Sequence, residues 1–211
     1  MSKTALIIID VQNDFITGSL AVPAGAEVIA PIAALSETAD VVVLTQDWHP
    51  ADHKSFASNH EGASPFTLIT MPYGEQVLWP DHCVQGTDGA ALNLPDNVLD
   101  AAVAVIRKGT NPDIDSYSAF LENDKTTSTG LEAWLRAKGV DTVIVAGLAL
   151  DYCVAFSAID AATAGFRVIV PLDACRGIDA RGCEAQIAAM RSAGVEVVDS
   201  LAQAPVPVPE V

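Results

Sequence analysis

Short apolar runs alternate along the chain with segments whose apolar residues recur at helical spacing. Six runs have the length and β-branched content of strands buried on both faces of a parallel sheet. They cover residues 4–10, 41–45, 101–106, 143–147, 166–171 and 195–198. Helical spacing or helix-ending glycines mark residues 27–38, 131–138, 154–164 and 181–193. This alternation predicts an α/β fold, a single-domain three-layer α/β/α sandwich around a mostly parallel six-stranded sheet with Rossmann-like topology.

The length of 211 residues favours one domain. We expect this domain to cover residues 1–200, and the proline-rich residues 201–211 to form an extended C-terminal tail. Residues 50–99 show little regular periodicity. A connection of that length inside a compact domain is usually functional, so we expect part of the site to lie there.

Charge and cysteine content narrow the functional classes. The chain has 11 basic and 27 acidic residues, and its net charge of −16 repels phosphate backbones and anionic lipids. We therefore expect neither nucleic acid nor a membrane as a partner. The four cysteines include no Cys-x-x-Cys pair, and the first apolar run is too short for a signal peptide. A reduced, cytoplasmic setting fits this pattern better than a disulfide framework.

Three predicted strands end close to residues that carry chemistry: Asp10, Lys108 and Cys153. Ligands of open α/β sheets bind outside the carboxyl ends of the strands, so these three side chains can meet at one site. There the ammonium and the start of a helix would lower the pKa of the thiol, and the carboxylate would take and return its proton. Each residue also has a purely structural interpretation. Asp10 could cap a turn, Lys108 could be a solvated loop lysine, and Cys153 could be a small buried apolar residue.

A second group suits a divalent metal ion. Asp47 and His49 follow the second predicted strand, and residues two apart in an extended segment point to the same side. His82, which lies in the long irregular connection, would complete a set of one oxygen and two nitrogen ligands with open positions. His53 is a further ligand or a neighbour of the ligands. Surface histidines are common, so the spacing alone leaves the metal site open.

The chain resembles the nicotinamidase/pyrazinamidase family of the isochorismatase-like cysteine hydrolase superfamily. The matching motifs occur in the order typical of the family and span residues 4 to about 199. They are Ile-Ile-Asp10-Val-Gln-Asn-Asp-Phe15, Asp47-Trp-His49-Pro, Trp79-Pro-Asp-His82-Cys-Val, Lys108-Gly, Tyr117-Ser-Ala-Phe120 and Gly147-Leu-Ala-Leu-Asp-Tyr-Cys153-Val.

The resemblance implies a role for individual residues. The catalytic triad of the family falls on Asp10, Lys108 and Cys153, and its metal ligands on Asp47, His49 and His82. Residues that line the pyridine pocket are matched by Phe15, Leu20, Trp79 and Tyr117. The family's cis peptide falls on the Leu148–Ala149 bond, which would aim the Ala149 N–H at an oxyanion alongside the Cys153 N–H. Leu150 departs from the Thr found in many members, and the role of His53 varies within the family.

The implied activity is metal-dependent hydrolysis of nicotinamide to nicotinate and ammonia through a cysteine thioester, as in NAD salvage. The family name extends the expected substrates to pyrazinamide. The implied cofactor is one divalent ion, with Zn²⁺ favoured over Fe²⁺ and Mn²⁺. Whether the chain forms a homo-oligomer stays open.

Three other functions compete with this hypothesis. An isochorismatase or an N-carbamoyl amidase shares the Asp/Lys/Cys set but lacks the metal trio. A hydrolase that uses metal-activated water would need Cys153 only for packing, and would survive alkylation of the thiol. A silent binding protein would have no need of a complete triad. No G-x-G-x-x-G, Walker or G-x-S-x-G motif occurs, which disfavours dinucleotide-binding, NTPase and serine-hydrolase functions.

Overall fold

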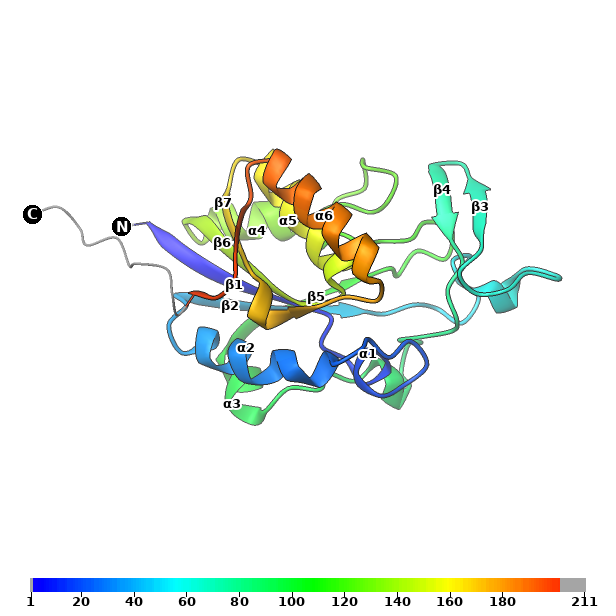
Figure 1. Ribbon diagram of the computed structural model, residues 1–211, viewed down its shortest axis with the longest axis horizontal. Coiled ribbons are helices and arrows are strands. Elements are labelled where there is room, and N and C mark those ends of the chain that lie inside the picture. The colour runs from blue at the N-terminus through cyan, green and yellow to red at the C-terminus, as the bar shows by residue number, and fades with distance from the viewer. Residues whose placement is uncertain (1, 202–211) are drawn as a thin grey trace, which may run out of the picture.

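A parallel sheet forms the centre of the computed structural model, which describes residues 2–201 (Figure 1). Its strands lie in the order β5-β2-β1-β6-β7-β9, and every pair between them is parallel. Their bounds are β1 Lys3–Ile9, β2 Val41–Asp47, β5 Ala102–Lys108, β6 Val140–Leu148, β7 Arg167–Pro171 and β9 Glu196–Val198. The six-stranded sheet is confirmed, and a two-residue strand, β8 (Cys175–Arg176), pairs with β6 as a seventh.

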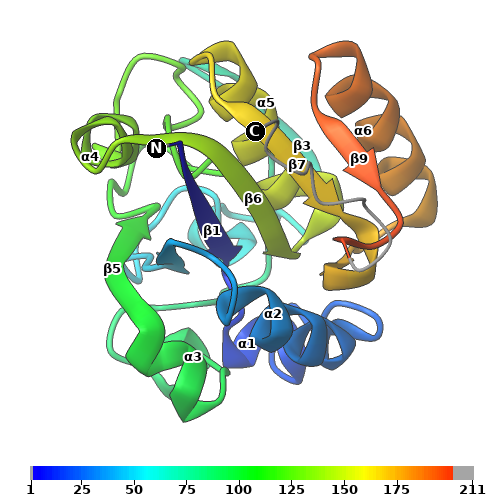
Figure 2. The same cartoon turned by 90° about the vertical axis from the view of Figure 1, so that its left-hand side faces the viewer.

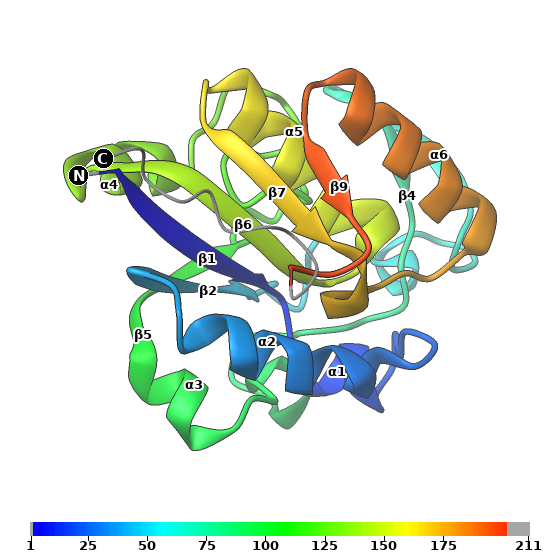
Figure 3. The same cartoon turned by 60° about the vertical axis from the view of Figure 1, so that its left-hand side comes forward.

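Helices cover both faces of the sheet, which confirms the three-layer prediction. Figure 2 shows α1, α2 and α3 on one side of the strands and α4, α5 and α6 on the other, and Figure 3 shows the same layers from an intermediate direction. Their bounds are α1 Asn13–Ile16, α2 Ile29–Ser36, α3 Asp96–Ala101, α4 Leu131–Ala137, α5 Ala155–Thr163 and α6 Ala180–Ser192. Short 3₁₀ turns lie at Gly25–Val28, Ala57–Asn59, Asp88–Ala90 and Leu172–Ala174, and a π-helical turn at Leu150–Val154.

The central strands are apolar because both of their faces are covered. In β1 the residues from Ala5 to Ile9 are at most 1% exposed, and β2 is buried along its whole length. Alternation of apolar and polar residues is therefore absent there, as expected for a parallel sheet between two helix layers. None of the helices in the described part of the chain is long and apolar enough to cross a membrane.

The long connection between β2 and β5 contains more regular structure than the sequence predicts. It holds an antiparallel hairpin of β3 (Leu68–Met71) and β4 (Gly74–Val77), and it ends in α3. Two four-residue strands with a single buried residue between them give too short a pattern for periodicity to reveal. The predicted tail at residues 201–211 lies outside the described residues, except for Leu201.

Gly147 lies in β6 directly opposite Ile9 of β1. It has φ +128°, and a Cβ atom built there would lie 2.2 Å from the Ile9 carbonyl oxygen. The two backbones pair in this register, Ile9 opposite Gly147, so neither can move away without breaking the ladder. A side chain at this position is excluded both by the backbone angle and by the lack of space.

We expect Gly147→Ala to lower the free energy of unfolding by more than about 3 kcal/mol, because the strain and the overlap add. Gly194→Ala is the matched control: Gly194 also has positive φ, +86°, but nothing lies within 4 Å of its Cβ position. Left-handed strain alone should cost that variant about 1–2 kcal/mol. Urea unfolding measures both values, and equal losses would contradict the close approach.

Candidate active site

The ammonium group of Lys108 lies at the centre of the site. Lys108 ends β5, is 2% exposed, and places its Nζ 2.9 Å from Asp10 Oδ2 and 2.6 Å from Asp47 Oδ1. Its Nζ also donates to the Ser116 carbonyl at 2.8 Å and lies 3.5 Å from Cys153 Sγ. One buried cation therefore contacts a member of each predicted group and the thiol, so the two groups form a single site.

Asp10 is held by Thr45, a residue that the sequence reasoning missed. The Thr45 hydroxyl donates to Asp10 Oδ1 at 2.6 Å, and the Asp10 N–H donates back to the hydroxyl at 3.1 Å. Both residues are fully buried. Asp10 directly follows β1, and Thr45 lies within β2, which pairs with β1. These bonds fix the carboxylate with its other oxygen, Oδ2, towards Lys108.

Cys153 lies in the π-helical turn that connects β6 to α5, and it is 6% exposed. The turn follows Ala149, and the Leu148–Ala149 peptide bond is cis, as the resemblance implied. Ala149 and Cys153 both line one pocket. The predicted position of the thiol in the first turn of a helix is confirmed: Cys153 lies in a π-helical turn, and α5 continues directly from that turn at Ala155.

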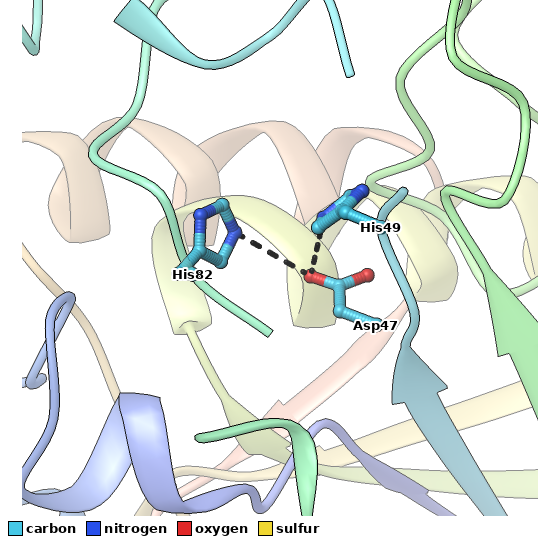
Figure 4. Close-up of side chains that lie close together, drawn as sticks. All are labelled: Asp47, His49 and His82. Carbon is cyan, nitrogen blue, oxygen red and sulfur yellow. Dashed lines mark ion pairs between the residues drawn. The ribbon is translucent and has the colours of Figure 1, made fainter. Parts of the chain in front are cut away.

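The three predicted metal ligands converge on one point. Figure 4 shows His49 and His82 pointing towards the same oxygen of Asp47, Oδ2, which lies 3.6 Å from His49 Nε2 and 3.9 Å from His82 Nε2. All three side chains are buried. Their ligand atoms lie within 4.8 Å of one another, a spacing that one metal ion can bridge.

The second nitrogen of each imidazole shows that this set fits a cation. His49 Nδ1 lies 2.9 Å from the Gly109 carbonyl oxygen, and His82 Nδ1 lies 2.8 Å from the Pro80 carbonyl oxygen. A carbonyl only accepts, so each Nδ1 carries the proton and each Nε2 presents a lone pair. Two lone pairs and a carboxylate oxygen that face one another repel unless a cation lies between them.

Gly109 makes room for this arrangement. It has φ +63°, and a Cβ atom there would lie 2.3 Å from His49 Cε1. The His49 ring can therefore reach the Gly109 carbonyl only because this position lacks a side chain.

His53 lies beside the trio and differs from it in its hydrogen bonding. The Ser55 N–H donates to His53 Nδ1 at 3.1 Å, so the neutral ring carries its proton on Nε2. The ring centroid lies 4.5 Å from that of His49, and His53 clusters with His49 and Asp115 rather than with Asp47 and His82. This geometry favours a neighbour of the ligands over a direct ligand.

The four predicted pocket residues, Phe15, Leu20, Trp79 and Tyr117, line a single pocket. It encloses about 330 Å³ of empty volume, including the solvent at its mouth, and the other lining residues are Asp47, His82, Asp115, Ala149, Tyr152, Cys153 and Ile178. The sequence reasoning missed three of these. Tyr152 adjoins Cys153 and Asp115 lies two residues before Tyr117, so proximity could have indicated both. Ile178 comes from the loop before α6, and no sequence signal marks it.

The model of the Isochorismatase domain family matches residues 4–201 of the chain. The chain belongs to the isochorismatase family.

Several relatives of this isochorismatase-family chain are named as nicotinamidases or pyrazinamidases. The nicotinamidase of Acinetobacter baylyi is 53% identical over 182 residues, which cover 86% of this chain and 85% of that protein. The solved Acinetobacter baumanii nicotinamidase/pyrazinamidase has a TM-score of 0.88 at 48% identity, covering 94% of this chain and 96% of that one. A Pyrococcus horikoshii pyrazinamidase solved in complex with zinc has a TM-score of 0.74 at 35% identity. The match covers 93% of this chain and 98% of that one.

Burial sets the charge states in this isochorismatase-family site. It raises the pKa of Asp10 to about 6, although the ammonium of Lys108 acts in the opposite direction. Burial also raises the pKa of the Cys153 thiol well above its usual value. Lys108 lowers that pKa, but by less than burial raises it. The predicted lowering of the thiol pKa by the ammonium is present, but loss of solvation and the nearby carboxylates outweigh it, so the net pKa is raised.

Lys108 itself remains charged. Burial lowers its pKa, but the carboxylates of Asp10 and Asp47 outweigh burial and hold the pKa well above its usual range. Asp47 likewise keeps its negative charge despite burial, because the ammonium of Lys108 holds the pKa of Asp47 below its usual range. The ion pair is thus an ammonium shared by two carboxylates, with an excess of negative charge on the side of the histidines.

We expect the chain to bind one equivalent of zinc, and His82→Ala to weaken that binding by more than about 100-fold, since it removes a lone pair aimed at Asp47. His53→Ala is the matched control. Loss of a group beside the ligands should weaken zinc binding about tenfold. Competition with a chelator measures both affinities, and equal losses in the two variants would make His53 a ligand.

Proposed function

We propose that the chain is a nicotinamidase that hydrolyses nicotinamide to nicotinate and ammonia, and that it also accepts pyrazinamide. The observation that carries the proposal is that Cys153, His82 and Asp47 line the same small aromatic-walled pocket. A flat ring that reaches the metal trio with one edge would present a substituent on its far side to the thiol. The names of the relatives support the same substrate.

Asp10 is the proposed general base and acid. The thiol of Cys153 rests protonated because it is buried, so attack requires an acceptor for its proton. Asp10 is ionised above about pH 6 and shares the Lys108 ammonium with the thiol, through contacts of 2.9 Å and 3.5 Å. Transfer of the proton to Asp10 leaves a thiolate whose new charge Lys108 can stabilise.

The chemistry then proceeds in two halves. The Cys153 sulfur bonds to the carboxamide carbon, and the negative charge on oxygen is stabilised by the Ala149 and Cys153 N–H groups. Asp10 returns its proton to the nitrogen, the carbon–nitrogen bond breaks, and ammonia leaves a thioester behind. Asp10 next takes a proton from water, whose oxygen displaces the sulfur to give nicotinate, and the proton returns to Cys153.

Asp47, His49 and His82 are the proposed ligands of a divalent metal ion, with zinc favoured. When bound, this ion would supply a Lewis-acidic contact for the ring nitrogen of the substrate. Phe15, Leu20, Trp79 and Tyr117 are proposed to hold the ring itself, because aromatic and aliphatic side chains suit both of its faces. Lys108 holds the carboxylates of Asp10 and Asp47 in place for both tasks.

A reducing compartment is part of the proposal. All four cysteines, Cys83, Cys153, Cys175 and Cys183, are free thiols, and a free nucleophilic thiol is best preserved in the cytoplasm. No nucleic acid or membrane partner is proposed.

The direct test is the release of ammonia from nicotinamide. We expect turnover by the zinc-loaded protein, loss of turnover on chelation, and recovery when zinc is added back. Cys153→Ala should lower kcat by at least about 10⁴-fold because it removes the nucleophile. Cys175→Ala, which replaces another buried thiol, is the control and should retain activity.

The same assay separates the competing functions. Activity that survives alkylation by iodoacetamide, or that persists in Cys153→Ala, would point to metal-activated water and overturn the nucleophile. Turnover of an N-carbamoyl amide or of isochorismate in preference to nicotinamide would place the chain elsewhere in the family.

A pH profile tests the role of Asp10. The pKa of Asp10 is raised to about 6, so the ionised base is lost as the pH falls through that value. We expect kcat/KM to fall about tenfold per pH unit below about pH 6 and to level off above it. A profile that stays flat between about pH 5 and about pH 8 would contradict Asp10 as the base.

A further inference from the structure

A single glutamine is buried in an otherwise exposed hairpin. Figure 1 shows the β3–β4 hairpin standing out from the rest of the fold, and most of its residues are exposed or half-buried. Gln76 in β4 is 0% exposed. A buried amide needs partners for every polar atom, so its contacts indicate what the hairpin is attached to.

The amide nitrogen of Gln76 reaches the pocket wall. Its Nε2 donates to Asp115 Oδ2 at 2.8 Å and to the Tyr117 hydroxyl at 3.0 Å, and it lies 2.7 Å from the Val77 carbonyl oxygen. Asp115 and Tyr117 both line the pocket, whereas Gln76 does not. Gln76 therefore lies outside the pocket and contacts two of the residues that line it.

The amide oxygen of Gln76 fixes which way the group points. It accepts from the Tyr73 hydroxyl at 3.1 Å and from Asn123 Nδ2 at 3.3 Å. Since an ionised carboxylate only accepts, the NH₂ end must face Asp115 and the oxygen must face Tyr73. The Tyr73 hydroxyl also accepts from the Asp115 N–H at 3.4 Å, which ties the hairpin and the loop together a second time.

Tyr117 is one of three rings that enclose the pocket edge to face. Its centroid lies 6.2 Å from that of Trp79 and 5.4 Å from that of Tyr152, and Trp79 lies 4.8 Å from Tyr152. Phe156 packs against Tyr117 from a further side, with the ring centroids 5.3 Å apart. These contacts hold the ring by its apolar edges and faces, and the hydrogen bond from Gln76 holds it by its hydroxyl.

We propose that Gln76 is a positioning residue: through Tyr117 it holds the pocket at the width of a single aromatic ring, and the β3–β4 hairpin thereby determines substrate affinity and ring-size selectivity. The inference rests on the proposed function, since it concerns the ring of that substrate. Gln76 touches neither the thiol nor the metal trio, so its contribution belongs to binding rather than to the chemical step. Uniform binding of this kind appears in KM and leaves kcat unchanged.

The test replaces Gln76 by leucine, which has a similar volume and no hydrogen-bonding group. We expect KM for nicotinamide to rise about tenfold, the equivalent of one or two hydrogen bonds, with kcat within about twofold of the unsubstituted protein. The ratio of kcat/KM for quinoline-3-carboxamide, a two-ring amide, to that for nicotinamide should rise by about tenfold, because Tyr117 can now move aside.

Tyr73→Phe is a milder variant that keeps Gln76 but removes the hydroxyl that orients it. It should change KM and the selectivity ratio in the same direction by about threefold. Gln186→Leu on α6, away from the pocket, is the matched control and should change neither. Thermal unfolding and zinc content, measured for every variant, show that fold and metal binding are retained.

Two results would overturn the inference. One is a fall in kcat with KM unchanged in Gln76→Leu, which would assign the network to the chemical step. The other is an unchanged KM and selectivity ratio in both Gln76→Leu and Tyr73→Phe. If Gln76→Leu does not fold, the result for Tyr73→Phe alone decides. Failure of the unsubstituted protein to release ammonia from nicotinamide would instead refute the proposed function, so the two failures are distinguishable.

Discussion

The buried ammonium of Lys108 is the interaction on which the site depends. An isolated charge in the interior is very costly, and its cost is offset here by two carboxylates within 2.9 Å and by the Ser116 carbonyl at 2.8 Å. The sheet order brings them together: β5, β2, β1 and β6 are consecutive neighbours, and Lys108, Asp47, Asp10 and Cys153 lie at or after their carboxyl ends. Asp47 and Lys108 are direct partners in the register of β2 and β5. Any slip of these strands would leave a buried charge unpaired, so the geometry of the site and the stability of the sheet are linked.

Two carboxylates against one ammonium leave an excess negative charge, which lies at Asp47 beside two imidazole lone pairs. That imbalance suits a divalent cation on the one side and a proton-accepting Asp10 on the other. The same lysine thus contacts both Asp47 of the metal-ligand group and the thiol. The pocket walls come from elsewhere in the chain: α1 and the loop after it, the segment after β4, the loop after β5, the turn after β6 and the loop before α6. The hairpin adds a layer behind the wall, where Gln76 contacts Tyr117.

Much of this could be predicted from the sequence. The six strands and four main helices follow from apolar runs and helix-ending glycines, and the strand-end rule selects Asp10 and Lys108 independently of the family resemblance. The hairpin was missed because its strands have four residues each, and α3 because it has six. Thr45 and Ile178 were missed for another reason. A threonine inside an apolar strand and an isoleucine before a helix look like packing residues until their neighbours are known.

The sequence by itself determined which chemical groups are available: one nucleophilic thiol after a strand, an acid and a lysine at strand ends, and an Asp-x-His pair with a distant histidine. It could do so because strand ends and extended pairs are local geometry, which residue spacing encodes. Only the tertiary structure decided how those groups behave. The raised pKa of the Cys153 thiol, the position of the proton on His53 and the tether between Gln76 and Tyr117 depend on burial and on residues far apart in the chain. Solvation and hydrogen-bond partners are properties of the packed interior, and no local pattern records them.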